Sequence, residues 1–152
     1  MLDERCIFVN TDCATSEEVL NYMGSRLYQL GYVKESFTKA VIERESMYAT
    51  GLDTEEIKTA IPHTDSVHVN ETTIAVMTLR KPVLFESMDQ DGAMLHVEVV
   101  FMLAIREPEK QLEMLGAVLN IIQDKQLLYA LRHAADAKEV VKRLTDKISE
   151  SR

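Results

Sequence analysis

The sequence predicts an α/β fold in which a mixed β-sheet is flanked by helices on both faces. Segments with apolar residues at every third or fourth position alternate along the chain with short runs of β-branched residues. The run over 97–105 is apolar at nearly every position, which indicates a central strand covered on both sides. No linker, repeat or low-complexity stretch interrupts this alternation, so residues 1–152 are expected to form a single domain.

The first half of the chain contains signals for two helices. Thr15 and Glu18 have the spacing of a capping box, and Gly31 is a typical helix stop, so a first helix is expected between them. A second helix is expected to begin near Ser36 and to break at Gly51. Its predicted apolar stripe consists of Phe37, Ala40, Val41 and Tyr48.

Strands are expected on either side of these helices and in the middle of the chain. The predicted strands besides the central one cover 6–9, 57–61, 73–79 and, as a separate edge strand, 82–86. The polar stretch over 88–92 is typical of a turn. After Pro108 the pattern becomes helical, and the predicted helices cover 112–122, 127–131 and 136–148.

The charge of the chain is distributed unevenly and excludes several functions. Residues 1–76 carry 6 basic and 13 acidic side chains and residues 77–152 carry 11 and 12, so the net charge of −8 divides into −7 and −1. An acidic chain without a basic cluster is a poor nucleic-acid binder. The longest apolar run is too short for direct membrane insertion. The N-terminus lacks a signal-peptide core, and Cys6 and Cys13 are expected to be reduced thiols in a cytoplasmic protein.

His63 is the first candidate functional residue. It follows Ile61 and Pro62, and because proline favours extended geometry before it, His63 is expected where a strand gives way to a loop. An imidazole at such a position acts as a base, a metal ligand or a covalent nucleophile. The alternative is a loop histidine that is bonded to the backbone.

Two polar side chains are expected to point inward near this region. Arg44 lies on the predicted apolar stripe of the second helix, where its planar guanidinium can bind a phosphate or carboxylate, or pair with a structural carboxylate. Gln111 shares a helix stripe with Leu115, Val118 and Ile122, and it is either an inward-facing donor or a first-turn surface residue.

A metal site at this segment is the third possibility. His63, Asp65 and His68 offer two imidazoles and a carboxylate, which suit zinc or iron and give a small metal-dependent hydrolase as an alternative function. The spacing matches no helical ligand pair, and no further ligand cluster is visible in the sequence. We therefore expect no metal and no cofactor.

Several short blocks, taken together and in this order, resemble the fructose/mannitol-type enzyme IIA domain of the bacterial sugar phosphotransferase system. These blocks are Glu43-Arg44-Glu45, Thr50-Gly51-Leu52, Ala60-Ile61-Pro62-His63, Leu103-Ala104-Ile105 and Gln111-Leu112-Glu113-Met114-Leu115. The resemblance covers nearly the whole chain. It implies that His63 accepts a phosphoryl group from the histidine-containing phosphocarrier protein and passes it to a cysteine of enzyme IIB, with Arg44 facing the phosphoryl oxygens.

One departure from the family pattern points to a branch within it. Many mannitol- and fructose-type members have a second histidine where this chain has Gln111. Galactitol-type members have glutamine at that position. They also have a histidine five residues after the active one, and the corresponding residue here is His68. The resemblance is therefore greatest to the galactitol-type branch. For phosphoryl transfer at His63, we expect Gln111 or His68 to donate further hydrogen bonds and Asp65 to be a candidate for orienting an imidazole. A regulatory IIA-like domain that is phosphorylated on His63 and controls partners by binding is the alternative.

Overall fold

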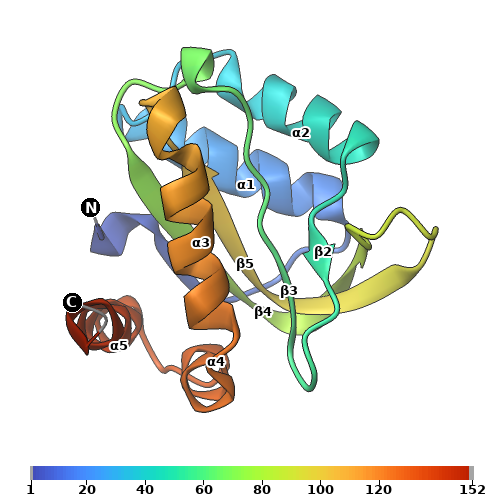
Figure 1. The fold of residues 1–152 in the computed structure, drawn as a ribbon, viewed down its shortest axis with the longest axis vertical. Helices are drawn as coiled ribbons and strands as arrows, with labels where there is room; N and C mark the ends of the chain where they lie inside the picture. Colours follow the sequence, from blue (N-terminus) through green and yellow to red (C-terminus); the bar gives the residue numbers. More distant parts are fainter. Residues whose placement is uncertain (1, 151–152) are drawn as a thin grey trace.

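Five strands form one mixed sheet in the computed structural model, which describes residues 2–150 (Figure 1). The strands are β1 (Ile7–Thr11), β2 (Gly51–Leu52), β3 (Lys58–Ala60), β4 (Thr73–Glu86) and β5 (Met94–Ala104). They lie in the order β1-β4-β5-β3-β2. The β4–β5 and β2–β3 pairs are antiparallel, and the β1–β4 and β3–β5 pairs are parallel. The apolar run over 97–105 thus forms the middle strand, as predicted.

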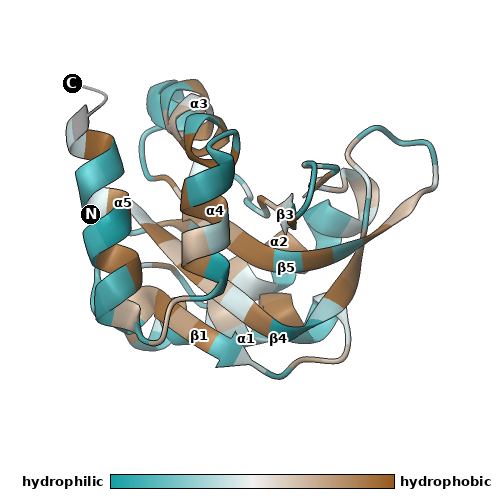
Figure 2. Ribbon diagram, turned by 90° about the horizontal axis from the view of Figure 1, so that it is seen from below, coloured by the Kyte–Doolittle hydropathy of each residue, from teal (hydrophilic) through white to brown (hydrophobic). Residues whose placement is uncertain are grey.

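Helices cover both faces of this sheet, which confirms the predicted fold class (Figures 1 and 2). The helices are α1 (Ser16–Gln29), α2 (Phe37–Met47), α3 (Gln111–Ile122), α4 (Lys125–Arg132) and α5 (Ala137–Glu150). Alternate residues of β5 enter different cores. Val100 and Met102 pack with α1 and α2, whereas Val99 and Phe101 pack with α3, α4 and α5. A strand with two buried faces reads as continuously apolar, which is the pattern seen in the sequence.

A side-chain cap fixes the start of α1 where the sequence predicts it. The Thr15 hydroxyl accepts a hydrogen bond from the Glu18 backbone N–H at 3.2 Å, and the Glu18 carboxylate accepts one from the Ala14 N–H at 2.7 Å. This capping box therefore closes one residue earlier than the standard pattern, which returns to the cap residue itself. Gly31 ends the α1 segment with a φ of +86°, a conformation that glycine adopts without steric cost.

The structure differs from the predicted strands in two places. Residues 82–86 are not a separate edge strand, because β4 continues through them and pairs with β5 on both sides of a register shift between Thr78 and Val83. Three exposed residues at this shift, Arg80, Lys81 and Pro82, interrupt the apolar pattern and made one strand resemble two. The short edge strand β2, which begins at Gly51, was not predicted at all.

The predicted apolar stripe of α2 is also only partly right. Phe37 and Val41 are buried, but Tyr48 is 53% exposed. The helix ends at Met47, and Tyr48 has φ −132° and ψ 84°, so its side chain no longer follows the helical stripe. Tyr48 instead lies beside Arg44, one turn earlier in the helix.

The remaining sequence expectations concern membranes and thiols. No helix within residues 2–150 has both the length and the apolar character that a bilayer crossing requires. Cys6 is buried and Cys13 is half-buried, and both are free thiols. Burial raises the pKa of the Cys6 thiol to about 11, so this side chain stays protonated at neutral pH.

Candidate functional site

His63 lies where the short strand β3 gives way to a loop, as predicted. The chain leaves β3 at Ala60 and remains beside β5, because the Leu103 N–H donates to the Pro62 carbonyl at 3.0 Å and His63 forms an isolated parallel bridge with Leu103. The segment that follows then runs between α2 and α3 (Figure 1). The central strand of the sheet therefore fixes the backbone that carries the imidazole.

A backbone carbonyl orients the imidazole ring. His63 Nδ1 lies 2.8 Å from the Ile61 carbonyl oxygen. A carbonyl oxygen only accepts hydrogen bonds, so Nδ1 carries a proton, and in the neutral ring the lone pair is therefore on Nε2. The Ile61 carbonyl thus orients the His63 ring. The sequence offers the Asp65 carboxylate as a candidate for orienting an imidazole.

The surroundings of His63 favour the neutral ring. Burial is the main cause that lowers the His63 pKa below its usual value of 6.5, and the positive charge of Arg44 lowers it further. The Ile61 carbonyl and the charge of Asp65 act in the opposite direction and are outweighed. A ring that is uncharged at neutral pH has a free lone pair on Nε2, which is the chemical form that can act as a nucleophile.

Arg44 brings to this site a cation that forms no ion pair within residues 2–150. It lies in the last turn of α2, half-buried, and its Nε is buried without a hydrogen-bond partner among the described residues. The Tyr48 ring centroid lies 5.2 Å from the Arg44 Cζ, which is a cation–π contact that occupies none of the guanidinium donors. A buried N–H that lacks an acceptor destabilises the fold, and an anionic ligand would satisfy it.

Gln111 shares a pocket with His63. The pocket has a volume of about 190 Å³, and its lining residues are His63, Leu103, Ile105, Pro108, Gln111, Leu112 and Leu115. Gln111 is the first residue of α3, and its Nε2 donates to the Ser66 hydroxyl at 3.2 Å. The start of α3 is thereby joined to the loop after His63, and the inward-facing interpretation of Gln111 is the one that the structure favours.

His68 and Asp65 lie outside the lining of this pocket. His68 Nδ1 is 2.7 Å from the hydroxyl of Ser36, the N-cap residue of α2, so His68 links the loop to that helix. Asp65 is exposed. Within residues 2–150, His63, Asp65 and His68 belong to no group of three or more His, Cys, Asp or Glu side chains that could hold a metal ion.

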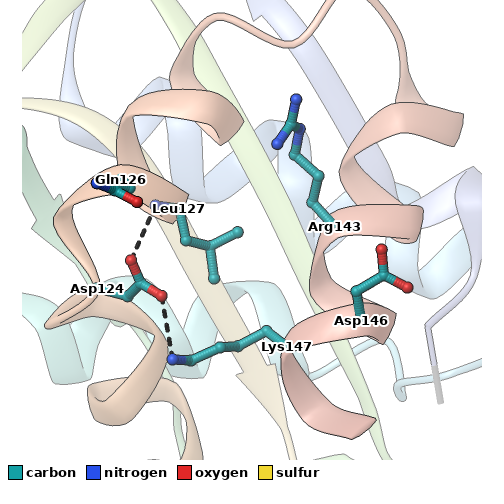
Figure 3. A pocket seen from close by; sticks show the side chains of 6 residues that line it. All are labelled: Asp124, Gln126, Leu127, Arg143, Asp146 and Lys147. Atoms are coloured by element: carbon teal, nitrogen blue, oxygen red, sulfur yellow. Dashed lines mark hydrogen bonds and ion pairs between the residues drawn. The ribbon is translucent and has the colours of Figure 1, made fainter. Parts of the chain in front are cut away.

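A larger pocket of about 370 Å³ lies between α4 and α5, away from His63 (Figure 3). The Asp124 carboxylate that lines it accepts hydrogen bonds from the Leu127 N–H at 3.0 Å and from the Lys147 Nζ at 3.0 Å. The first bond caps α4 and the second ties α5 to it. Helix capping and helix packing therefore explain the contacts of Asp124 and Lys147.

Sequence reasoning missed the contribution of Glu45. Its carboxylate binds both the backbone N–H and the hydroxyl of Thr50, and the Thr50 carbonyl accepts the Ile61 N–H. In the sequence, Glu45 is visible only as part of the Glu43-Arg44-Glu45 block. The one available signal was a glutamate in the last turn of a helix, five residues before a threonine.

Comparison with known proteins identifies the family of this arrangement. The sequence profile described as "Phosphoenolpyruvate-dependent sugar phosphotransferase system, EIIA 2" matches residues 1–147. The galactitol-specific EIIA component of Escherichia coli strain K12 is 28% identical over 114 residues, which are 75% of each chain. A probable licABCH operon regulator of Bacillus subtilis strain 168 is 27% identical over 78% of this chain, which corresponds to 18% of the regulator.

Solved structures agree with this assignment. The enzyme IIAMTL of Escherichia coli, in its complex with phosphorylated enzyme IIBMTL, superposes with a TM-score of 0.81. The sequences are 23% identical, and the match covers 96% of this chain and 98% of the other. The solved structure therefore shows the same fold, and the profile places the chain among phosphotransfer proteins. The chain belongs to the EIIA 2 family of the phosphoenolpyruvate-dependent sugar phosphotransferase system.

Proposed function

We propose that the chain is a phosphocarrier whose His63 accepts a phosphoryl group on Nε2. The donor is the phosphorylated histidine-containing phosphocarrier protein, and the acceptor is a cysteine of an enzyme IIB during uptake of a sugar or sugar alcohol. The observation that supports this most is the 2.8 Å bond from His63 Nδ1 to the Ile61 carbonyl, which leaves the Nε2 lone pair as the nucleophile.

The transfer needs no proton movement at His63. The Nε2 lone pair forms the new N–P bond while the N–P bond of the donor phosphohistidine breaks, and its electron pair stays on the donor imidazole. The His63 ring keeps its Nδ1 proton, which remains bonded to Ile61. In the second step a thiolate of enzyme IIB attacks phosphorus, and the bonding pair returns to Nε2.

Arg44 and Gln111 supply stabilisation at this centre. The Arg44 guanidinium, whose buried Nε has no acceptor among the described residues, binds the phosphoryl oxygens as negative charge is redistributed over them. Gln111 lines the pocket with His63, so its amide is available as a further donor. The place of His68, bonded to Ser36 at the N-terminus of α2, supports an anchoring role for that histidine.

Exposed apolar side chains at the site support a protein as the donor and acceptor. Leu112 lines the pocket and is 84% exposed, and Val67, next to the Ser66 that binds Gln111, is 65% exposed. Large apolar side chains exposed together are typical of a protein-docking surface. The complex of the mannitol-type relative with phosphorylated enzyme IIB supports the second partner.

The sugar and the regulatory alternative rest on the relatives. The galactitol-specific relative, together with Gln111 and His68, supports galactitol as the transported compound. The operon regulator among the relatives favours, as a second candidate, a domain that is phosphorylated on His63 and acts by binding.

Labelling with radioactive phosphoenolpyruvate, enzyme I and the carrier protein tests the proposal. We expect the wild type to be labelled and His63→Ala to lose all label. His96→Ala, which changes an exposed histidine on β5, is the matched control and should be labelled normally. Normal labelling of His63→Ala would overturn the assignment of the nucleophile.

Delivery to enzyme IIB separates transport from regulation. Labelled protein mixed with the cognate IIB should transfer its phosphoryl group, and an IIB variant without the acceptor cysteine should remain unlabelled. Retention of the label on the IIA chain, with every candidate IIB present, would favour the regulatory function.

A further inference from the structure

Both oxygens of the Glu45 carboxylate accept hydrogen bonds from one residue, Thr50, which lies beyond the end of α2. Glu45 Oε2 accepts the Thr50 backbone N–H at 2.8 Å, and Oε1 accepts the Thr50 hydroxyl at 2.8 Å. Thr50 is 3% exposed and directly precedes β2. Both carboxylate oxygens thus hold the segment that returns from the end of α2 to the sheet.

Two further hydrogen bonds continue from Thr50 to the nucleophile. The Thr50 carbonyl accepts the Ile61 N–H at 3.3 Å, and the Ile61 carbonyl accepts the His63 Nδ1–H at 2.8 Å. A continuous chain therefore runs from Glu45 through Thr50 and Ile61 to the ring of His63. The hydrogen bond between Thr50 and Ile61 joins backbone groups next to β2 and β3. Its geometry therefore depends on the register in which those two strands pair.

Glu45 forms this contact although a cation is next to it in the sequence. Arg44 precedes Glu45, yet within residues 2–150 no ion pair joins the two side chains. Burial raises the pKa of Glu45, and the two bonds from Thr50 lower it in part. A half-buried carboxylate that binds neutral donors in preference to a neighbouring arginine leaves the guanidinium available for another anion.

We propose that Glu45 is a positioning residue that fixes the orientation and the Nδ1–H tautomer of His63 through Thr50 and Ile61. This inference rests on the proposed function of His63. When the Glu45 carboxylate is absent, the Thr50 segment loses two bonds and the Ile61 carbonyl becomes less well placed. The Nε2–H tautomer then gains population, and that tautomer has no lone pair on Nε2 with which to attack phosphorus.

Three substitutions separate hydrogen bonding from charge. Glu45→Ala removes both bonds to Thr50. Glu45→Gln keeps both, because its amide oxygen accepts the Thr50 N–H and its amide N–H donates to the Thr50 hydroxyl. Glu43→Ala is the matched control, since Glu43 lies on the same helix with an exposed side chain.

The first measurement uses the unphosphorylated protein and does not depend on the proposed function. The ¹⁵N chemical shifts of the His63 ring report which nitrogen carries the proton. We expect a dominant Nδ1–H tautomer in the wild type, Glu45→Gln and Glu43→Ala, and a mixture of tautomers in Glu45→Ala. A wild-type tautomer population in folded Glu45→Ala would overturn the inference.

The second measurement is the rate of phosphoryl transfer from the carrier protein. We expect Glu45→Ala to slow transfer by about 10- to 100-fold, because small misplacements of a reacting group have effects of this order, with Glu45→Gln close to the wild type. A Glu45→Gln variant as slow as Glu45→Ala would show that charge is responsible and would also overturn the inference. An unlabelled wild type would instead contradict the proposed function, while the tautomer comparison would still test Glu45.

Thr50 provides a second route if Glu45→Ala does not fold. Thr50→Val loses the hydroxyl bond but keeps the N–H bond, and Thr50→Ser keeps both. We expect a partial tautomer shift in Thr50→Val and none in Thr50→Ser. An unchanged tautomer in Thr50→Val would contradict the chain of hydrogen bonds.

Discussion

At the scale of single residues, His63 differs from a histidine that a carboxylate orients. An acidic partner at Nδ1 stabilises the imidazolium and raises the pKa, whereas the Ile61 carbonyl carries no charge and fixes the tautomer with a smaller effect. Burial and the Arg44 charge then keep the His63 pKa below 6.5. The site thereby combines a fixed ring with a free lone pair at neutral pH.

Arg44→Gln tests the electrostatic part of this arrangement. Removing the positive charge should raise the His63 pKa, because the Arg44 charge is one of the causes that lower it, while burial continues to act in the lowering direction. The midpoint is measurable from ring ¹H–¹⁵N shifts against pH. The same variant should slow phosphoryl transfer by about 100-fold, the usual effect of losing one donor to a developing charge.

Arg44→Lys is the matched control for Arg44→Gln. It keeps the charge, so the His63 midpoint should stay close to that of the wild type, while the planar donor fork is lost and transfer remains slow. Urea titration of both variants controls for unfolding. A His63 midpoint that is unchanged or lower in Arg44→Gln would contradict the charge effect.

At the scale of the elements, two buried threonines have opposite roles in the sheet. Thr59 on β3 and Thr78 on β4 are both 0% exposed. The Thr59 hydroxyl has no partner among the described residues, whereas the Thr78 hydroxyl accepts the Asn10 backbone N–H at 2.8 Å. Asn10 has a φ of +51°, so Thr78 satisfies a backbone that bends at a β1 irregularity.

Substitution by valine should therefore change stability in opposite directions at these sites. Thr59→Val removes an unpaired buried hydroxyl at nearly constant volume and should raise the free energy of unfolding by about 1 kcal/mol. Thr78→Val leaves the Asn10 N–H without its acceptor and should lower it by about 1 to 3 kcal/mol. Urea unfolding of both variants provides the comparison, and a destabilised Thr59→Val would contradict the assignment of an unsatisfied hydroxyl.

At the scale of the whole molecule, the uneven distribution of charge along the sequence bears on how the proposed carrier protein approaches the site. The half of the sequence with net charge −7 contains both Arg44 and His63. A small site with a free guanidinium and a neutral imidazole therefore lies in the more acidic half of the chain. Such a distribution attracts a basic protein surface over distances comparable to the Debye length.

This asymmetry predicts a salt-dependent encounter with the carrier protein. The second-order rate of phosphoryl transfer should fall as added salt shortens the Debye length from about 30 Å to about 3 Å, because steering by surface charge is screened. Stopped-flow or quenched-flow labelling at several salt concentrations gives the slope. Circular dichroism over the same series controls for structural change, and a flat dependence would argue against electrostatic steering.

Much of the fold and part of the site could be predicted from local sequence. The central strand over 97–105 is apolar at nearly every position because both of its faces are buried, and the Thr15 cap depends on residues only three positions away. His63 was predictable as a strand-end residue from Pro62 and the preceding β-branched and small residues. The sequence also contains the motif blocks that place the chain in its family.

Only the tertiary structure decided which groups meet at the site. The Glu45–Thr50–Ile61 connection requires the antiparallel pairing of β2 with β3, and the pocket shared by His63 and Gln111 requires α3 to pack beside the loop after β3. Such contacts join residues that are far apart in the chain or in separate elements. Sequence by itself determined which side chains were available, and the sheet order determined which of them came together, because hydrogen bonds depend on three-dimensional proximity.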